Sequence, residues 1–202
     1  MLAIGPENKK IFFVHIPRTA GRYINSLFFS SGFNLHYSDY DDASNYGIHL
    51  PHLHYPLYRN LLNDDTIPEF SVIRDPFERF RSAITPILHH FYSDLNLNTF
   101  DKTELFKFID HLREVQFKHN NWFRPQVEFI SDKTLIWNYE SGFDLKFKNW
   151  IYDNFNIKLE NKRKDINRDA PYDHLQKFEF DEIRKEIIKD YYKKDYEQFY
   201  SK

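Results

Sequence analysis

Arginine and serine residues that suit anion binding stand at two places where a strand is expected to lead into a helix. The first stretch, "FVHIPRTAG", leads from an apolar run into Thr19, Ala20 and Gly21, with Arg18 and Arg22 on either side. Backbone N–H groups and the positive dipole end at a helix N-terminus attract anions, and each arginine adds a full charge. The stretch predicts a phosphate-binding loop, although one glycine and two arginines also fit an ordinary strand-to-helix turn.

The second stretch, "VIRDPFERFRSAI", places Arg74 at the end of a strand and Ser82 eight residues later. Eight residues are about two helical turns, so Ser82 returns to roughly the same face of the helix. A guanidinium can hold a phosphate through two parallel hydrogen bonds, and a serine hydroxyl can add a third. Glu78, Arg79 and Arg81 are interpreted as surface charges and salt-bridge partners. Two such junctions on one sheet edge indicate a ligand with two separated phosphate-like groups.

A group of histidines, His49, His52 and His54 in "GIHLPHLHYPLY", lies between the two junctions. A neutral histidine is a common general base near pH 7, so one of them could remove the proton of an attacking hydroxyl. A zinc site is an alternative, because histidine is a frequent zinc ligand. Purely structural histidines are a third possibility. His15 lies within the first strand and is expected in the core or at the edge of a cofactor site.

Strands and helices are expected to alternate along the chain. Hydrophobic periodicity and turn residues predict strands over 9–16, 69–75 and 133–140, and helices over 22–31, 76–92, 101–115, 120–130, 143–155 and 180–200. Asp75, Pro76 and Glu78 should start the second helix, and Pro86 should kink or interrupt it. The alternation predicts an α/β domain with a mostly parallel central sheet flanked by helices. In such sheets ligands bind beyond the carboxyl ends of the strands, where both junctions would lie.

Composition excludes several classes of protein. The 202 residues suit a single domain, 1–202, and no run reaches the roughly 18 apolar residues of a membrane helix. The N-terminal "MLAIGPENKK" does not resemble a secretory leader, and the absence of cysteine excludes disulfides and thiolate chemistry. A formal net charge of −2 argues against a general nucleic-acid binder. A cytoplasmic protein is expected.

The two stretches resemble motifs of the sulfotransferases that use 3′-phosphoadenosine 5′-phosphosulfate (PAPS). "FVHIPRTAG" resembles their 5′-phosphosulfate loop, commonly P-K-T-G/A-G/S-T, and "VIRDPFERFRSAI" resembles their 3′-phosphate motif, R-D-P-x-x-R-x-x-S. Weaker similarities follow in order at "RPQVEFI", "INRDAPYDHL" and "IIKDYYKKDYEQFY". The nearest branch is that of the carbohydrate sulfotransferases related to heparan sulfate 2-O-sulfotransferase. The resemblance implies a P-loop-like three-layer fold.

The resemblance also implies roles for individual residues. The 5′-phosphosulfate would be surrounded by Arg18, Thr19, Ala20, Gly21, Arg22 and Tyr23. Arg74 and Ser82 would bind the 3′-phosphate, and Arg168 in the late loop would reach the nucleotide. His52 and His54 match a His-x-His pair of this branch, with His52 as the base and His54 next. The reaction would move a sulfuryl group from PAPS to a hydroxyl of a carbohydrate or glycolipid acceptor and release PAP, without a metal.

The sequence departs from the family pattern at two positions in the loop. Arg18 stands in place of the usual lysine, and Arg22 in place of the usual Thr or Ser. Arginine keeps the charge and has fixed donors, but it does not readily give up a proton, because its pKa exceeds about 12. A catalytically decayed protein that still binds PAP is therefore one alternative. An ATP-dependent small-molecule kinase is another, although the G-x-x-x-x-G-K-[ST] pattern of such enzymes is absent.

Overall fold

A five-stranded mixed sheet forms the centre of the computed structural model, which describes residues 1–38, 48–91, 100–115, 118–160, 175 and 178–201. The strands are β1 (Leu2–Ile4), β2 (Lys10–Val14), β3 (Asn34–His36), β4 (Glu69–Ile73) and β5 (Leu135–Asn138), in the order β3-β1-β2-β4-β5. The strands β2, β4 and β5 are parallel, whereas β1 is antiparallel to both β2 and β3.

The expectation of a mostly parallel sheet is therefore wrong for the part that contains β1 and β3. A short turn joins β1 to β2, closed by a hydrogen bond of 2.9 Å from the Gly5 N–H to the Lys9 carbonyl. Two strands joined by so short a turn can pair only in antiparallel fashion. A long connection that contains α1, β3 and α2 joins β2 to β4 and allows these two strands to run parallel.

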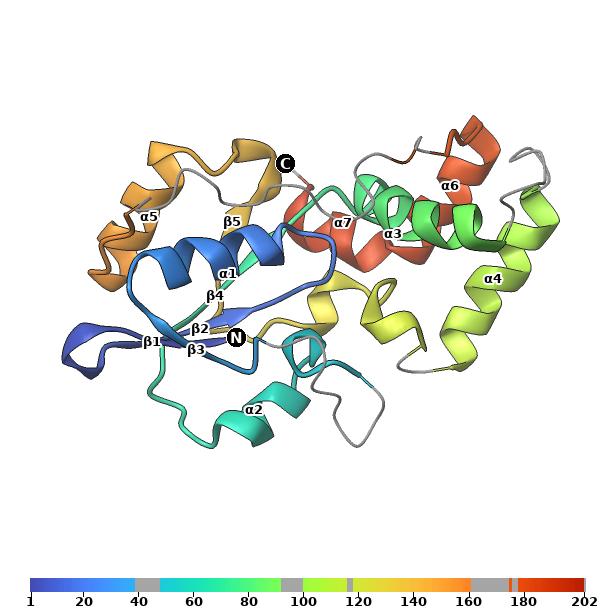
Figure 1. The fold of residues 1–202 in the computed structure, drawn as a ribbon. Helices are drawn as coiled ribbons and strands as arrows, with labels where there is room; N and C mark the ends of the chain where they lie inside the picture. Colours follow the sequence, from blue (N-terminus) through green and yellow to red (C-terminus); the bar gives the residue numbers. More distant parts are fainter. Residues whose placement is uncertain (39–47, 92–99, 116–117, 161–174, 176–177, 202) are drawn as a thin grey trace.

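Helices cover both faces of the sheet (Figure 1). Their bounds are α1 (Gly21–Ser30), α2 (Leu57–Leu62), α3 (Pro76–Phe91), α4 (Lys102–Glu114), α5 (Leu145–Phe155), α6 (Glu182–Tyr191) and α7 (Lys193–Phe199). The expected helices over 22–31, 76–92, 101–115 and 143–155 are confirmed, and 180–200 contains two helices in series. The stretch 120–130 instead contains short 3₁₀ turns, and α3 continues past Pro86 without interruption.

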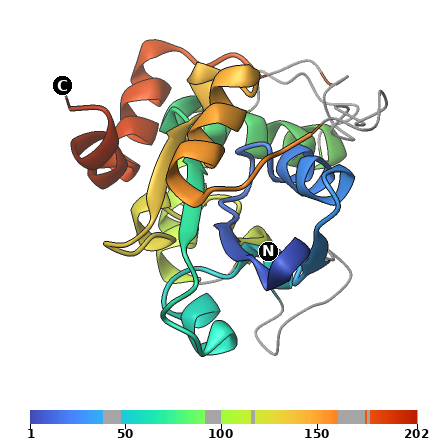
Figure 2. The same cartoon turned by 90° about the vertical axis from the view of Figure 1, so that its left-hand side faces the viewer.

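Alternating side chains of the central strands divide the core into two layers. Phe13 and Phe70 pack in a cluster with residues of α1 and α5. Phe12 and Val14 face the other way, into a cluster that includes Tyr58 of α2. Consecutive residues of a strand point to opposite faces, so continuously apolar strands require cover on both sides. Both views show α1 and α5 on the upper side and α2 on the lower side (Figures 1 and 2).

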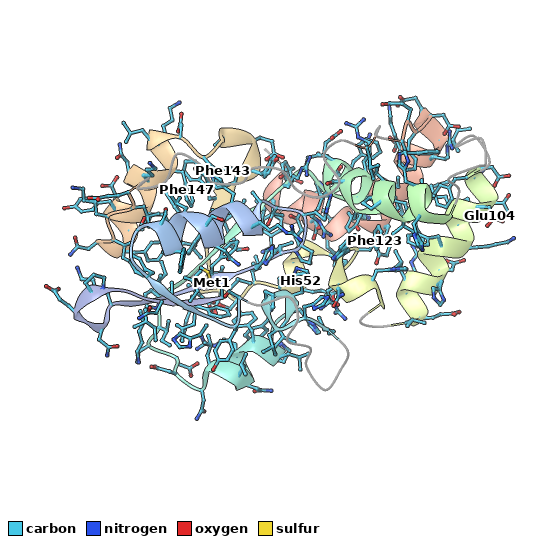
Figure 3. The ribbon with its side chains drawn as sticks, viewed as in Figure 1. Met1, His52, Glu104, Phe123, Phe143 and Phe147 are labelled. Carbon is cyan, nitrogen blue, oxygen red and sulfur yellow. The ribbon has the colours of Figure 1, made fainter. Side chains whose placement is uncertain are left out.

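A third apolar cluster holds the remaining helices together. It joins Phe80 of α3, Ile109 of α4, Ile188 of α6 and Tyr192 around Phe123. Figure 3 shows Phe123 among these helices and Phe147 in the sheet part of the molecule, with His52 between them. Among the described ranges, no helix is both long enough and apolar enough to span a membrane.

Candidate functional site

The loop between β2 and α1 has an unusual backbone. Arg18 and Ala20 adopt left-handed conformations, with φ of 70° and 71°. Residues with a Cβ rarely take up this region, which costs about 1 kcal/mol or more for each of them, and such strain persists mainly at ligand sites. The Thr19 hydroxyl, which is fully buried, donates a hydrogen bond of 2.7 Å to the Ile16 carbonyl. The loop is thus held in a fixed shape at the N-terminus of α1.

Gly21, the one glycine of the loop, is required by a close contact with His15. A Cβ at position 21 would lie only 1.8 Å from His15 Nε2, well inside the contact distance of two heavy atoms. The His15 side chain is 4 % exposed and lies beneath the first turn of α1. His15 is therefore a core residue that supports the loop. Of the two positions expected for it, the core is the one observed.

The second junction has the Asp75 cap that its sequence predicts, but not the reciprocal bond of a capping box, because the Asp75 N–H donates to Glu140 and the Glu78 carboxylate pairs with Arg81. The carboxylate of Asp75 accepts a hydrogen bond of 2.9 Å from the backbone N–H of Glu78, and α3 begins at Pro76. This cap places Arg74 just before the first turn of α3 and Ser82 on the side of the helix that faces the β2–α1 loop, where Arg18 reaches it.

Three of the predicted anion-binding residues contact one another. The Arg18 guanidinium donates hydrogen bonds to the Ser82 hydroxyl from Nε and Nη2, at 3.2 and 2.9 Å. Arg74 Nη1 donates to the backbone carbonyl of Arg18 at 3.2 Å. The two junctions thus meet at the carboxyl edge of β2 and β4, and two cationic side chains are collected in one place.

Each of these arginines also lies over an aromatic ring. The guanidinium carbon of Arg74 is 4.5 Å from the ring centre of Tyr139, and that of Arg18 is 5.3 Å from the ring centre of Trp122. An aromatic face attracts a cation and limits its movement. Tyr139 and Trp122 therefore help to position the two guanidinium groups.

The remaining residues of the predicted loop site are placed differently. Arg22 is exposed in the first turn of α1. The Tyr23 hydroxyl donates to the Phe143 carbonyl at 3.1 Å and its ring packs against Phe143, so Tyr23 is directed toward the start of α5 rather than toward Arg18. Arg168 lies outside the described residues.

His15, His52 and His49 lie next to one another. The ring of His52 lies 4.9 Å from that of His15 and 5.9 Å from that of His49, measured between ring centres. Burial, reinforced by the neighbouring His49, lowers the pKa of His52 to about 3. His52 is therefore neutral at pH 7, and the charge of Arg18 acts on it in the same direction.

His54 is fixed by an amide. The Asn121 side-chain nitrogen lies 3.3 Å from His54 Nδ1 and also donates to the His52 carbonyl at 3.0 Å. Burial, together with Arg124, lowers the pKa of His54 to about 4. No three histidine or carboxylate side chains in the described ranges are grouped as a metal site, so His49, His52 and His54 do not converge as zinc ligands.

Sequence reasoning missed three buried polar residues next to the site: Arg79, Gln126 and Asp195, each 0 % exposed. The interpretation of Arg79 as a surface charge is wrong, because its guanidinium donates to the carbonyls of Trp122 and Arg124 at 2.8 and 2.6 Å. The sequence feature that indicates burial of Arg79 is its spacing. Arg79 lies four residues before the buried Ala83, on the apolar stripe of α3.

The comparisons with known proteins identified no relative of this chain. No protein-family model matches the chain, and searches of curated proteins and of solved structures found no similar protein.

Proposed function

We propose that this protein is a PAPS-dependent sulfotransferase with a P-loop-like fold, which transfers a sulfuryl group to a hydroxyl of a carbohydrate or glycolipid in the cytoplasm. The observation that carries the proposal is the contact of the two junctions. Arg18 of the first and Ser82 of the second are hydrogen-bonded, and Arg74 donates to the Arg18 carbonyl. A donor with a phosphosulfate at one end and a 3′-phosphate at the other needs two adjacent cationic sites of this kind.

The residues present fit such a donor. The strained loop backbone at Arg18 and Ala20 and the N-terminus of α1 offer N–H groups to the 5′-phosphosulfate. Arg74 and Ser82 would hold the 3′-phosphate, which distinguishes PAPS from ATP. PAPS supplies an activated sulfuryl group, and Arg18 stabilises the negative charge that develops on the leaving phosphate oxygen.

His52 is the proposed base, and His54 is the next choice. The low pKa of His52 keeps its ring unprotonated, which a base requires, but also makes it a weak base. Burial is the largest cause of this lowering, and the charge of Arg18 contributes to it. An anion bound at the loop would offset the charge of Arg18 and raise the pKa of His52. Donor binding would thus make the histidine a stronger base when the acceptor hydroxyl arrives.

A decayed protein that binds PAP without turnover is the second candidate. It is favoured by one observation: Arg18 stands where the resembled family has lysine, and its guanidinium is already hydrogen-bonded to Ser82. The kinase alternative has no comparable support, because the loop lacks the G-x-x-x-x-G-K-[ST] pattern, and with it the lysine, that holds ATP–Mg in P-loop kinases.

Titration calorimetry of PAP, ADP and ATP–Mg tests the cofactor assignment. We expect the wild type to prefer PAP to ADP, and Arg74→Ala to weaken PAP binding by about tenfold to a hundredfold, the worth of a hydrogen-bonded charge. Arg113→Ala is the matched control, because Arg113 is a surface residue of α4 that pairs with Asp110. Equal binding of PAP and ADP by the wild type, or no effect of Arg74→Ala, would refute the assignment.

A further inference from the structure

One short segment, 121–127, contacts the histidines and both arginines of the candidate site. Asn121 donates to the carbonyl of His52, and the ring of Trp122 lies under the guanidinium of Arg18. Gln126 is hydrogen-bonded to Arg74. The segment therefore links the histidines, the loop arginine and the arginine of the second junction.

Gln126 holds the backbone of Arg74 from both sides. Its side-chain oxygen accepts a hydrogen bond of 3.0 Å from the Arg74 N–H, and its side-chain nitrogen donates one of 2.8 Å to the Arg74 carbonyl. β4 ends at Ile73, so this primary amide takes the place of a neighbouring strand for the next residue. Because both hydrogen bonds use the backbone, they set the direction in which the Arg74 side chain leaves the main chain, without engaging its guanidinium.

Asp195 of α7 fixes Gln126 in turn. Its two carboxylate oxygens accept hydrogen bonds from the backbone N–H groups of Gln126 and Val127, at 2.9 and 3.0 Å. Asp195 is 0 % exposed, and a buried carboxylate is tolerated only where its oxygens are hydrogen-bonded and a cation is near. Arg79 supplies the neighbouring charge and binds the carbonyls of Trp122 and Arg124.

The chain thus carries a buried cation and a buried anion whose hydrogen bonds both end on the backbone of one short segment. A simple packing role would be met by apolar side chains at lower cost, since burying a charge is expensive. What the charged pair adds is direction: its hydrogen bonds fix backbone groups of Trp122, Arg124, Gln126 and Val127, and so the positions from which the side chains of Trp122 and Gln126 extend. These two side chains are the ones that contact Arg18 and Arg74.

We propose that Gln126 and Asp195 are positioning residues that set the preference of the site for nucleotides with a 3′-phosphate, by holding Arg74 in the orientation that meets this group. The inference rests on the proposed function, because it takes Arg74 as the ligand of the 3′-phosphate. It goes beyond that function by assigning selectivity to α7, whose Asp195 lies 69 residues along the chain from Gln126.

Two variants and one control test the proposal. Gln126→Met keeps the length of the side chain and removes both hydrogen bonds to Arg74. Asp195→Asn keeps its size and replaces one of the two accepting oxygens by a donor. Glu69→Gln is the control: Glu69 is also a buried carboxylate that accepts side-chain hydrogen bonds, from Thr134 and Ser131, but it stands at the opposite end of β4. Folding of each protein is first verified by circular dichroism and thermal unfolding.

The readout is the ratio of the ADP and PAP dissociation constants, measured by calorimetry. We expect Gln126→Met and Asp195→Asn to lower the preference for PAP by roughly fivefold to tenfold, as the loss of one or two buried hydrogen bonds implies, with ADP affinity little changed. Glu69→Gln should leave the ratio unchanged even if it lowers the unfolding temperature.

The outcomes separate the two proposals. A wild type that prefers PAP, together with variants that keep its ratio or lose ADP and PAP affinity equally, would overturn the positioning role alone. A wild type without preference for PAP would overturn the proposed function and this inference with it. If Asp195→Asn does not fold, Gln126→Met decides, because it changes no charge and leaves the hydrogen bonds of Asp195 to the backbone in place.

Discussion

The guanidinium of Arg74 donates a hydrogen bond of 3.2 Å to the backbone carbonyl of Arg18, across 56 residues of sequence. This contact joins the end of β4 to the loop after β2, so the two candidate anion sites cannot move independently. Arg18 in turn reaches Ser82 on α3. The mutual arrangement of the two sites is therefore set by side chains of the sites themselves as well as by the sheet.

Substitution of Arg18 separates an enzyme from a decayed binding protein. We expect Arg18→Ala to lower the rate of sulfuryl transfer from PAPS to sugar acceptors by about a hundredfold to a thousandfold, the usual effect of removing one donor to the developing charge. PAP affinity should fall much less, because Arg74 and Ser82 are still present. Arg18→Lys, which keeps the charge, should retain part of the activity. A variant that keeps full turnover would show that Arg18 has no catalytic role.

The sequence predicted the parts of the fold that depend on local signals. Asp75 caps α3, as its position before an apolar periodic stretch indicated. Gly32 follows the end of α1 with a φ of 89°, a conformation that glycine favours after a helix. The short strands β1 and β3 were not predicted, because three-residue strands carry no measurable periodicity.

The contacts that organise the candidate site were less accessible to prediction. The charge of Arg79 indicated a surface residue, although its place on the apolar stripe of α3 indicated burial. Its acceptors and the hydrogen bonds of Asp195 to Gln126 and Val127 lie more than 40 residues away in the sequence, and residue spacing does not reveal such pairs. The sequence predicted that the segments containing Arg18 and Arg74 lie at the same edge of the sheet, because the carboxyl ends of parallel strands share one edge. It did not predict the hydrogen bond between these two residues.

Gly21 can be tested through its contact with His15. Gly21→Ala should lower the free energy of unfolding in urea by about 1–3 kcal/mol, because the new methyl group would overlap the imidazole. The double variant Gly21→Ala/His15→Ala should be more stable than the sum of the single changes implies, since removal of the ring makes room.

Gly32→Ala is the control for this series. Its φ is 89° and no atom lies within 4 Å of an added Cβ, so only backbone strain of about 1 kcal/mol is expected. Strict additivity of Gly21→Ala and His15→Ala would contradict the close packing of loop and imidazole.

The buried His52 makes stability depend on pH. Its pKa is about 3 in the folded protein and near 6.5 in the unfolded chain, so between these values the unfolded chain binds more protons. The free energy of unfolding should therefore fall as pH is lowered through this window, by up to about 1.4 kcal/mol per pH unit from this residue. His52→Gln should make the slope between pH 7 and pH 5 shallower, as measured by urea unfolding. His90→Gln, on the exposed end of α3, is the control. Equal slopes for wild type and His52→Gln would show that His52 titrates normally in the folded protein.

The ring of Tyr139 should contribute to nucleotide binding through Arg74. The guanidinium carbon lies 4.5 Å from the ring centre, and a cation–π contact of about 0.5–2 kcal/mol holds the arginine in place. Tyr139→Leu should therefore weaken PAP binding by roughly threefold to tenfold while ADP binding, which lacks the 3′-phosphate, changes little. Tyr139→Phe keeps the ring and should bind PAP like the wild type.

Tyr152→Leu serves as the control for Tyr139→Leu, because Tyr152 is 52 % exposed on α5. Calorimetry of the four proteins with both nucleotides decides between two uses of Tyr139. If Tyr139→Phe loses as much PAP affinity as Tyr139→Leu, the hydroxyl rather than the ring face acts on the nucleotide. If Tyr139→Leu weakens ADP and PAP equally, Tyr139 contacts a part common to both nucleotides, and the orientation of Arg74 does not depend on it.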